Sequence, residues 1–437
     1  MESQSVRDGL LERWRAARRE TEALCLALEV EDYCVQPEED VSPPKWHLAH
    51  TTWFFETFLL GKHLPGYRPR DPSYAFLFNS YYEAAGARAP RGKRGDYSRP
   101  TVAEVYAYRK QVDAALEDFL GSPAGNWAEI GGPRAEIRDL IELGLNHEQQ
   151  HQELLLTDIK RILHFNPSRP AYRTRPKKGS LADVPPSWVE VEGGLKDIGW
   201  EGKGFAFDNE KPRHKHFLVP FRIEDRAVSN SRYLAFIADG GYDRPDLWLS
   251  EGWRISREGG WRAPLYWEWD GAGWSEYTLE GLRPLRMAAP VCHVSYFEAD
   301  AFARWSGARL PTEQEWEVAS RLAGLESLRR GSFAEEGALH PDPASASAGF
   351  PLQMLGDVWE WTASAYLPYP GFRPFPGAVG EYNGKFMMDQ MVLRGGSCAT
   401  PRSHIRNTYR NFFPAGARWQ FSGIRLAETK HSTEANP

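Results

Sequence analysis

The spacing of apolar residues changes near residue 170, and this change constrains the fold more than any other feature. Before it, apolar side chains such as Leu10 and Trp14 recur at helical spacing. After a proline- and arginine-rich segment over 165–180, glycine and tryptophan become frequent and helical spacing nearly disappears. A chain of 437 residues is also too long for one ordinary core. We therefore expect one domain over 1–170 and a second over 171–437.

The first domain is predicted to be all-α. Apolar periodicity and helix-breaking residues predict four helices. Thr101 and Glu104 form a Thr-x-x-Glu capping pattern at the start of the third. Four helices in this length of chain favour a four-helix bundle. The predicted helices cover residues 5–30, 45–61, 101–121 and 133–163.

The second domain is predicted to be α+β with much irregular structure. Short strand candidates such as "SWVEVEGG" (187–194) and "HFLVPFRI" (216–223) are separated by long loops. Only residues 233–239 and 295–307 have a helical pattern. Loops on such a scaffold can carry functional residues.

Composition indicates a soluble protein of a reducing compartment. The net charge of −6 argues against nucleic-acid and membrane-surface partners. No apolar run reaches membrane-spanning length, and the charged amino terminus does not have the pattern of a signal peptide. The four cysteines include no C-x-x-C motif. A cytoplasmic location is expected.

The segment "NHEQQHQE" (146–153) contains two histidines with metal-ligand spacing. His147 and His151 lie four residues apart in a predicted helix, so their side chains share one face about 5–6 Å apart at Cβ. On the inward face of a bundle, two imidazoles can hold one ion. A hydrogen-bonded histidine pair is the alternative. The same letters match H-E-x-x-H, in which Glu148 would be the base of a zinc protease.

A third histidine lies on another predicted helix, in "WHLAHTTWFF". His50 shares one face with Trp46, Trp53 and Phe54, and this aromatic face predicts that His50 is buried. A buried histidine near two others is a candidate ligand. His47, three residues earlier, is either a partner of the ligands or an exposed residue.

The residues around these histidines do not favour the protease. A zinc protease needs a further ligand downstream, where only His164 is found. Glu153 lies on the other side of the helix from His151 and is not expected to bind the same ion. Three neutral imidazoles without a carboxylate suit Zn, Cu or Fe(II).

A set of motifs in the second domain points to a known family. They occur at 290–321 ("PVCHVSYFEADAFARWSGARLPTEQEWEVASR"), 356–364 ("GDVWEWTAS"), 393–398 ("LRGGSC") and 421–427 ("FSGIRLA"). In this order they resemble the formylglycine-generating-enzyme (sulfatase-modifying factor) domain, a variant of the C-type-lectin fold. The family's cysteine pair before the last motif is missing, and Cys398 stands alone. Formylglycine synthesis is therefore not expected.

The first domain resembles the DinB-like metal-binding bundle, through W-H-L-A-H and H-x-x-x-H-x-E. The fusion of both domains resembles the ergothioneine-biosynthesis sulfoxide synthases. These are non-haem iron(II) enzymes that use O2 to join cysteine or γ-glutamylcysteine to the imidazole C2 of hercynine (N-α-trimethylhistidine), giving a sulfoxide. The resemblance implies Fe(II) ligation by His50, His147 and His151, and an accidental H-E-x-x-H match.

The resemblance also implies residues that bind hercynine. Gln150, Asn411 and Phe412 match the family's contacts to this substrate. An aromatic face such as that of Phe412 attracts a quaternary ammonium by about 0.5–2 kcal/mol. Without the resemblance, Phe412 would be interpreted as a core residue.

This sequence departs from the family members that use γ-glutamylcysteine. They have an aspartate and an arginine where this chain has Phe413 and Ala417. We therefore expect free cysteine as the thiol substrate, in a pocket that includes Phe413. Arg70, Arg91 or Arg94 would hold its carboxylate. γ-Glutamylcysteine remains the alternative substrate.

The family's catalytic tyrosine and its neighbouring tyrosine are also missing, with Gly377 and Gly380 at these positions. We expect Tyr81 or Tyr82 to donate the proton instead, and the further candidates are Tyr382 and Tyr366. Two rival hypotheses are a metal-binding scaffold protein without oxygenase chemistry and a hydrolytic zinc enzyme.

Overall fold

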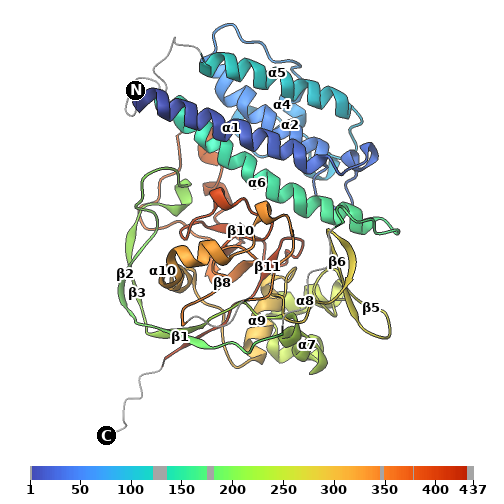
Figure 1. Ribbon diagram of the computed structural model, residues 1–437, viewed down its shortest axis with the longest axis vertical. Helices are drawn as coiled ribbons and strands as arrows, with labels where there is room; N and C mark the ends of the chain where they lie inside the picture. Colours follow the sequence, from blue (N-terminus) through green and yellow to red (C-terminus); the bar gives the residue numbers. More distant parts are fainter. Residues whose placement is uncertain (1, 122–134, 175–181, 345–348, 377, 431–437) are drawn as a thin grey trace. The chain divides into compact units, whose positions relative to one another are not determined.

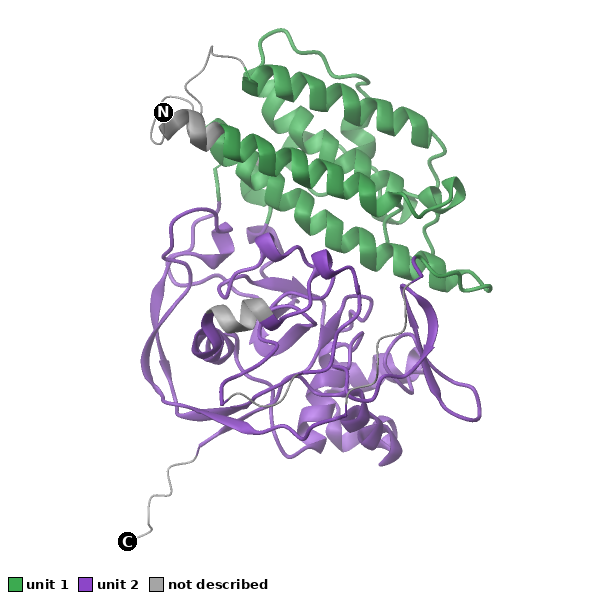
Figure 2. Ribbon diagram, viewed as in Figure 1, with its two compact units in different colours: residues 1–172, 375–382 green, residues 173–374, 383–437 purple. Residues whose placement is uncertain are grey.

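The computed structural model describes residues 2–121, 135–174, 182–344, 349–376 and 378–430. Its contacts divide the chain into two compact units (Figure 2). Unit 1 contains residues 1–172 and 375–382, and unit 2 contains residues 173–374 and 383–437. The short segment 375–382 thus clusters with unit 1, which the expected division at residue 170 did not include. Among the described helices, none has the length and apolar character needed to cross a membrane.

Unit 1 is a helical bundle, as predicted. Its long helices are α1 (Glu2–Cys25), α2 (Pro44–Phe55), α5 (Val102–Gly121) and α6 (Ala135–Phe165). Helix α1 packs against α6, and α2 packs against both α5 and α6 (Figure 1). A π-helical turn (Glu56–Leu60) extends α2 into the short helix α3 (Gly61–His63), and α4 (Tyr74–Phe78) lies before α5.

Local sequence explains where these helices begin and how closely they pack. Thr101 and Glu104 form the predicted capping pair: each side chain accepts a hydrogen bond from the other residue's backbone N–H, at 3.2 and 2.7 Å. Gly144 lies where α6 meets α2. A Cβ atom there would come within 2.5 Å of the Phe55 ring, so only glycine allows this approach.

A buried ion cluster joins the four long helices. Oε1 of Glu148 on α6 accepts hydrogen bonds from Arg109 on α5 at 2.5 Å and from Thr21 on α1 at 2.8 Å. Its Oε2 accepts from Arg18 on α1 at 3.0 Å, and Arg18 also donates to Thr52 on α2. Burial alone would raise the pKa of Glu148, but the charges of Arg109 and Arg18 lower it to about 2.

Unit 2 is an α+β fold, as predicted, with short strands and long loops. Its sheets have the strand orders β1-β4-β12, β10-β9-β8-β11, β2-β3 and β5-β6-β7. The strands are β1 (Trp188–Val191), β2 (Gly194–Ile198), β3 (His214–Leu218), β4 (Phe221–Glu224), β5 (Trp267–Trp269), β6 (Trp274–Thr278), β7 (Gly281–Pro284), β8 (Trp359–Ala365), β9 (Met391–Arg394), β10 (Asn411–Phe413), β11 (Ser422–Gly423) and β12 (Ala427–Thr429).

Unit 2 has more helices than the sequence predicted. Helices α7 (Asn230–Ala238) and α9 (Tyr296–Trp305) confirm the two expected ones. The expectation of only two is wrong, because α8 (Ser250–Glu258) and α10 (Glu313–Arg330) are also present. Helix α8 is short and rich in charge, so apolar periodicity could not reveal it.

Buried arginine–glutamate pairs hold the loops of unit 2 together. Arg425, beside β11, makes a bidentate contact with Glu360 on β8, with a closest distance of 2.7 Å. Trp316 on α10 donates its indole N–H to the same carboxylate at 2.6 Å. Arg410 makes a similar pair with Glu313 at 2.8 Å. Tryptophans and ion pairs therefore connect segments that are distant in sequence.

We predict that Glu148→Ala destabilises unit 1 by about 3–5 kcal/mol, because it removes the buried carboxylate that two buried arginines share. Of the ion pairs among the described residues, Arg18 would keep only that with Asp113, and Arg109 only that with Glu22. Chemical denaturation monitored by circular dichroism measures this loss. The matched control is Glu117→Ala, which removes the exposed 2.8 Å pair with Arg15 and should cost at most about 1 kcal/mol. Equal effects of the two variants would contradict a dominant role of the buried cluster.

Candidate metal centre

Three histidines from two helices of unit 1 form a compact group. His50 on α2 and His147 and His151 on α6 each offer one ring nitrogen, and these atoms lie within 4.8 Å of one another. All three side chains are buried. Nε2 of His50 lies 3.1 Å from Nε2 of His147. The structure therefore brings together the three residues that the sequence singled out.

Hydrogen bonds fix the tautomer of two of these histidines. Nδ1 of His50 lies 2.6 Å from the carbonyl oxygen of Phe78, which can only accept, so this nitrogen carries the hydrogen. Behind His151, His47 places Nε2 2.9 Å from Oδ2 of Asp158 and Nδ1 2.9 Å from Nδ1 of His151. Because a carboxylate accepts, Nε2 of His47 donates to Asp158, and Nδ1 of His47 then accepts a hydrogen bond from Nδ1 of His151. Nε2 of both His50 and His151 then keeps a lone pair for an ion.

Burial favours the neutral, ligating form of all three imidazoles. It lowers the pKa of His147 to about 3 and those of His50 and His151 well below the ordinary value. Nδ1 of His147 is buried and has no hydrogen-bond partner within the described ranges. A neutral donor set with one lone pair per ring fits a divalent metal ion.

One of the three arginines expected to hold a thiol substrate lies beside this group. The guanidinium of Arg94 stacks on the Trp46 ring at 3.5 Å from its centroid, and Trp46 in turn stacks on His50 at 4.5 Å. Arg94 is buried, donates to Ser42 at 2.8 Å, and makes no salt bridge within the described part of the chain, although the charge of Asp158 acts on it. Burial, helped by the charge of Arg91, lowers the pKa of Arg94 to about 9. An incoming carboxylate would compensate this buried charge.

The other two arginines already have surface partners. Arg70 is exposed and donates to Gln111 at 2.7 Å. Arg91 is exposed and donates to the backbone oxygen of Asp40 at 2.7 Å. Of the three predicted arginines, only Arg94 combines burial with stacking beside the histidines.

The segment 375–382 brings a tyrosine to the histidines. The ring of Tyr382 lies 5.6 Å from that of His147, and its hydroxyl donates to Oε1 of Gln150 on α6. The neighbouring Glu381 accepts hydrogen bonds from the backbone N–H groups of Glu83 and Ala84, both at 2.9 Å. Sequence spacing could not place Tyr382 here, because the segment joins unit 1 only through tertiary contacts.

The two tyrosines favoured from the sequence lie in the same unit. Tyr81 and Tyr82 have ring centroids 4.7 Å apart, and Tyr81 lies 6.2 Å from Tyr382. Tyr82 is fully buried and packs against Phe58 at 5.0 Å and Trp53 at 5.8 Å. Tyr81 therefore lies next to Tyr382, whereas Tyr82 belongs to the aromatic core of the bundle.

The predicted residues at the end of the chain belong to unit 2. Asn411, Phe412 and Phe413 form β10, and Phe412 stacks on Tyr366 with a centroid distance of 4.0 Å. Tyr366 is fully buried and accepts a hydrogen bond from Asn209 at 2.9 Å. Phe413 packs edge-on against Trp419, and Ala417 is buried. Gly380 lies in a 3-10 turn, and Gly377 is outside the described residues.

The zinc-protease interpretation of H-E-x-x-H is not supported by the structure. Both carboxylate oxygens of Glu148 are held by Arg18, Arg109 and Thr21 in the bundle core. A carboxylate whose pKa is about 2 is a poor general base near neutral pH. Glu148 is therefore a structural residue.

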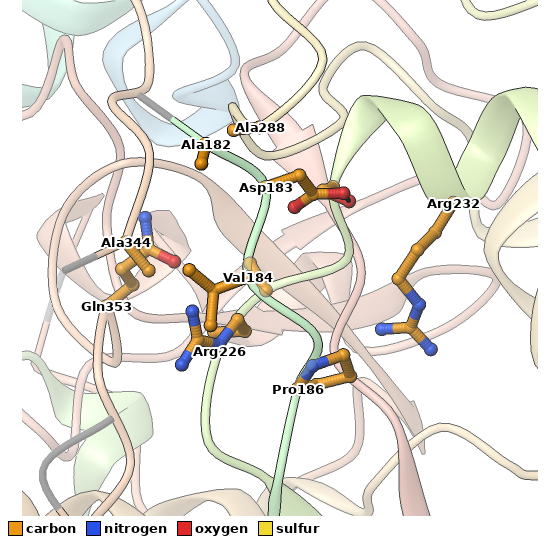
Figure 3. Close-up of a pocket in the computed structure, with 11 residues that line it drawn as sticks. Ala182, Asp183, Val184, Pro186, Arg226, Arg232, Ala288, Ala344 and Gln353 are labelled. Carbon is orange, nitrogen blue, oxygen red and sulfur yellow. Dashed lines mark hydrogen bonds between the residues drawn. The ribbon is translucent and has the colours of Figure 1, made fainter. Parts of the chain in front are cut away.

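A surface hollow of unit 2 is lined by Asp183, Arg226 and Arg232, among others (Figure 3). Its arginines are already paired, because Arg226 contacts Asp225 at 3.0 Å and Arg232 contacts Glu224 at 2.7 Å. These two arginines are therefore not free to bind an anionic ligand, and the histidine group is the stronger candidate site.

Comparison with known proteins matches both units. Residues 13–155 match the DinB superfamily, and residues 175–430 match the sulfatase-modifying factor enzyme 1-like domain. The chain is 37% identical to hercynine oxygenase of Mycolicibacterium smegmatis, over 89% of this chain and 91% of that protein. It is 32% identical to hercynine oxygenase of Mycobacterium tuberculosis, over 91% of this chain and 93% of that protein.

A more distant relative is ergothioneine biosynthesis protein 1 of Schizosaccharomyces pombe. It is 31% identical over 51% of this chain and 28% of its own length. The two hercynine oxygenases, in contrast, match along almost the whole of both chains. With a DinB-type bundle followed by a sulfatase-modifying-factor-type domain, this chain belongs to the hercynine oxygenase family.

Proposed function

We propose that this protein is an iron(II)-dependent oxygenase of ergothioneine biosynthesis. It would join the sulfur of cysteine to C2 of the hercynine imidazole and oxidise the sulfur to a sulfoxide. One oxygen atom of O2 ends in the sulfoxide and the other in water, and the two substrates supply the electrons. The same reaction with γ-glutamylcysteine is the alternative.

The observation that carries this proposal is the buried group of three neutral imidazoles. His50, His147 and His151 would hold the ion, and His47 would orient His151 through its contact with Asp158. Iron(II) would supply the redox chemistry toward O2 that zinc does not have. Three protein ligands leave positions open for substrates. The relatives' name, hercynine oxygenase, supports the same reaction class.

Gln150, Asn411 and Phe412 are the residues proposed to bind hercynine. The amide of Gln150 projects from the same helix as His147 and His151 and already accepts a hydrogen bond from Tyr382. A cation–π contact with Phe412 would suit the trimethylammonium group. Gln150 would orient the imidazole end, because an amide can both donate and accept.

Arg94 is the residue we favour for the carboxylate of cysteine. It is the buried arginine of the three candidates, and its Nε has no hydrogen-bond partner among the residues described. A carboxylate could therefore bind it without displacing an existing acid. Phe413 and Ala417, which replace two polar residues of the γ-glutamylcysteine-using members, support cysteine as the thiol.

The proton donor is proposed to be Tyr81 or Tyr82. Burial raises the pKa of Tyr82 well above its ordinary value, so its hydroxyl keeps its proton at neutral pH. Tyr382 is the third candidate, and its hydroxyl contact with Gln150 suggests a role in holding that amide. A phenol that protonates oxygen during its reduction contributes about 10²–10⁴ in rate.

Each of His50→Ala, His147→Ala and His151→Ala should lose most of its iron and nearly all turnover, because each removes one ligand of a three-ligand site. Anaerobic Fe(II) reconstitution and metal analysis measure this, followed by O2 uptake and mass spectrometry with hercynine and cysteine. The control His164→Ala lies on the same helix and should keep its iron.

Full iron occupancy in the His50→Ala protein would remove that residue from the ligand set. Wild-type protein that binds iron but consumes no O2 with either thiol would instead support the scaffold hypothesis. Wild-type protein that binds zinc tightly, is hydrolytically active with it and consumes no O2 with iron would support the hydrolase hypothesis.

Either Tyr81→Phe or Tyr82→Phe should lower sulfoxide formation by about 10²–10⁴, or divert cysteine to its sulfinate, with iron still bound. Tyr382→Phe should mainly raise the KM for hercynine, because it releases Gln150. Both products are quantified by mass spectrometry. The control Tyr106→Phe removes a hydroxyl that lies 3.0 Å from that of Tyr33, away from the histidine contacts. Diversion to sulfinate in Tyr382→Phe alone would assign the donor to Tyr382.

Arg94→Met should lower kcat/KM for cysteine ten- to hundredfold, which corresponds to the roughly 1.5–3 kcal/mol of one charge-assisted hydrogen bond. Arg91→Met, which removes an exposed arginine of the same loop, should have a smaller effect. Iron content and thermal midpoint are measured in parallel, because Arg94 also packs on Trp46. A wild-type preference for γ-glutamylcysteine in kcat/KM would refute the cysteine assignment.

A further inference from the structure

A second group of metal-ligating side chains is buried in unit 2. Glu276, Cys292 and His340 each present one donor atom, and these atoms all lie within 4.8 Å of one another. The three residues are 3%, 2% and 7% exposed. We propose that they form a zinc(II) site that is separate from the histidine group of unit 1. This proposal does not depend on the proposed function.

The geometry of His340 distinguishes this group from a simple ion pair. Nε2 of His340 lies 3.0 Å from Oε1 of Glu276. Within the described residues, however, neither ring nitrogen of His340 makes a hydrogen bond of acceptable geometry. Two atoms that bind one ion approach each other in this way, because each directs its lone pair at the ion rather than at the other atom.

The chemistry of the three donors favours zinc. A thiolate and an imidazole suit Zn(II) and are poor ligands for Mg(II) or Ca(II). The charges of a Cys292 thiolate and a Glu276 carboxylate together neutralise one divalent ion. A neutral complex is the form that a buried site tolerates best. The donor atoms lie within 4.8 Å of one another, a separation from which zinc bonds of about 2.0–2.3 Å can form once the side chains close on the ion.

The three ligands come from segments far apart in sequence. Glu276 lies on β6, the central strand of the β5-β6-β7 sheet. Cys292 lies in the loop that leads into α9, and His340 lies in the loop between α10 and β8. One ion would cross-link a small sheet to two loops. In a unit with so much irregular structure, such a cross-link stabilises the folded state in proportion to how tightly the ion binds.

The thiolate gives the proposed site a spectroscopic signature that the histidine group lacks. Cobalt(II) replaces zinc at sites with sulfur and nitrogen ligands. A thiolate–cobalt bond produces a charge-transfer band in the near ultraviolet, whereas three imidazoles do not. The readout is therefore independent of catalytic activity and of the metal bound by unit 1.

The test is an anaerobic cobalt(II) titration of the full-length apoprotein. We expect the charge-transfer band to saturate with one equivalent of cobalt(II), whether or not a further ion binds at the histidines. Cys292→Ser should lose the band and one equivalent. Cys398→Ser, which changes another buried cysteine of unit 2, should keep both.

His340→Gln provides a second variant that retains the thiol. This variant should lower the cobalt(II) affinity of the site that contains Cys292 at least tenfold. It tests the proposal even if Cys292→Ser does not fold. A wild-type titration without the band overturns the proposal. So does a band that persists in Cys292→Ser, or one whose affinity is unchanged in His340→Gln.

Discussion

The carboxylate of Glu148 is the interaction on which the arrangement of unit 1 depends. It is buried among the helices and receives hydrogen bonds from Arg18, Arg109 and Thr21. These contacts set the rotation of α6 about its own axis. Neighbouring residues on a helix point in directions about 100° apart, so holding Glu148 toward α1 and α5 leaves His147 facing α2. A structural ion cluster and two of the three clustered histidines thus share one helix.

The proposed metal centre is prepared by contacts that lie behind its three histidines. The carbonyl of Phe78 fixes His50, and the chain from Asp158 through His47 orients His151. These contacts hold hydrogens on the nitrogens that face away from the centre. Lone pairs are left on the nitrogens that face it, and burial keeps the rings neutral. Aromatic side chains of α2 pack against the group, with Trp46 and Trp53 stacked on His50 and Phe54 beside His147.

Several parts of this molecule could be predicted from local pattern. The i, i+4 spacing placed His147 and His151 on one face, and the aromatic neighbours of His50 predicted its burial. Helix α8 and the contact of Tyr382 with Gln150 could not be predicted in this way. The first has only two large apolar residues, Trp253 and Ile255, among its nine, which is too few for a helical repeat. The second depends on a segment that joins unit 1 from more than two hundred residues farther along the chain. Arg94 was one of three equivalent candidates until burial separated it from Arg70 and Arg91.

The order of residues alone was enough to divide the chain into a helical and an α+β part, and to select the three histidines. Both depend on periodicity, which is a local property. Tertiary structure decided that Glu148 is a core residue rather than a base, and that His47 supports His151. It also brought Glu276, Cys292 and His340 into one buried group. These assignments depend on which distant side chains share a low-dielectric interior, because only there do charge, lone pairs and hydrogen-bond partners determine what each group can do.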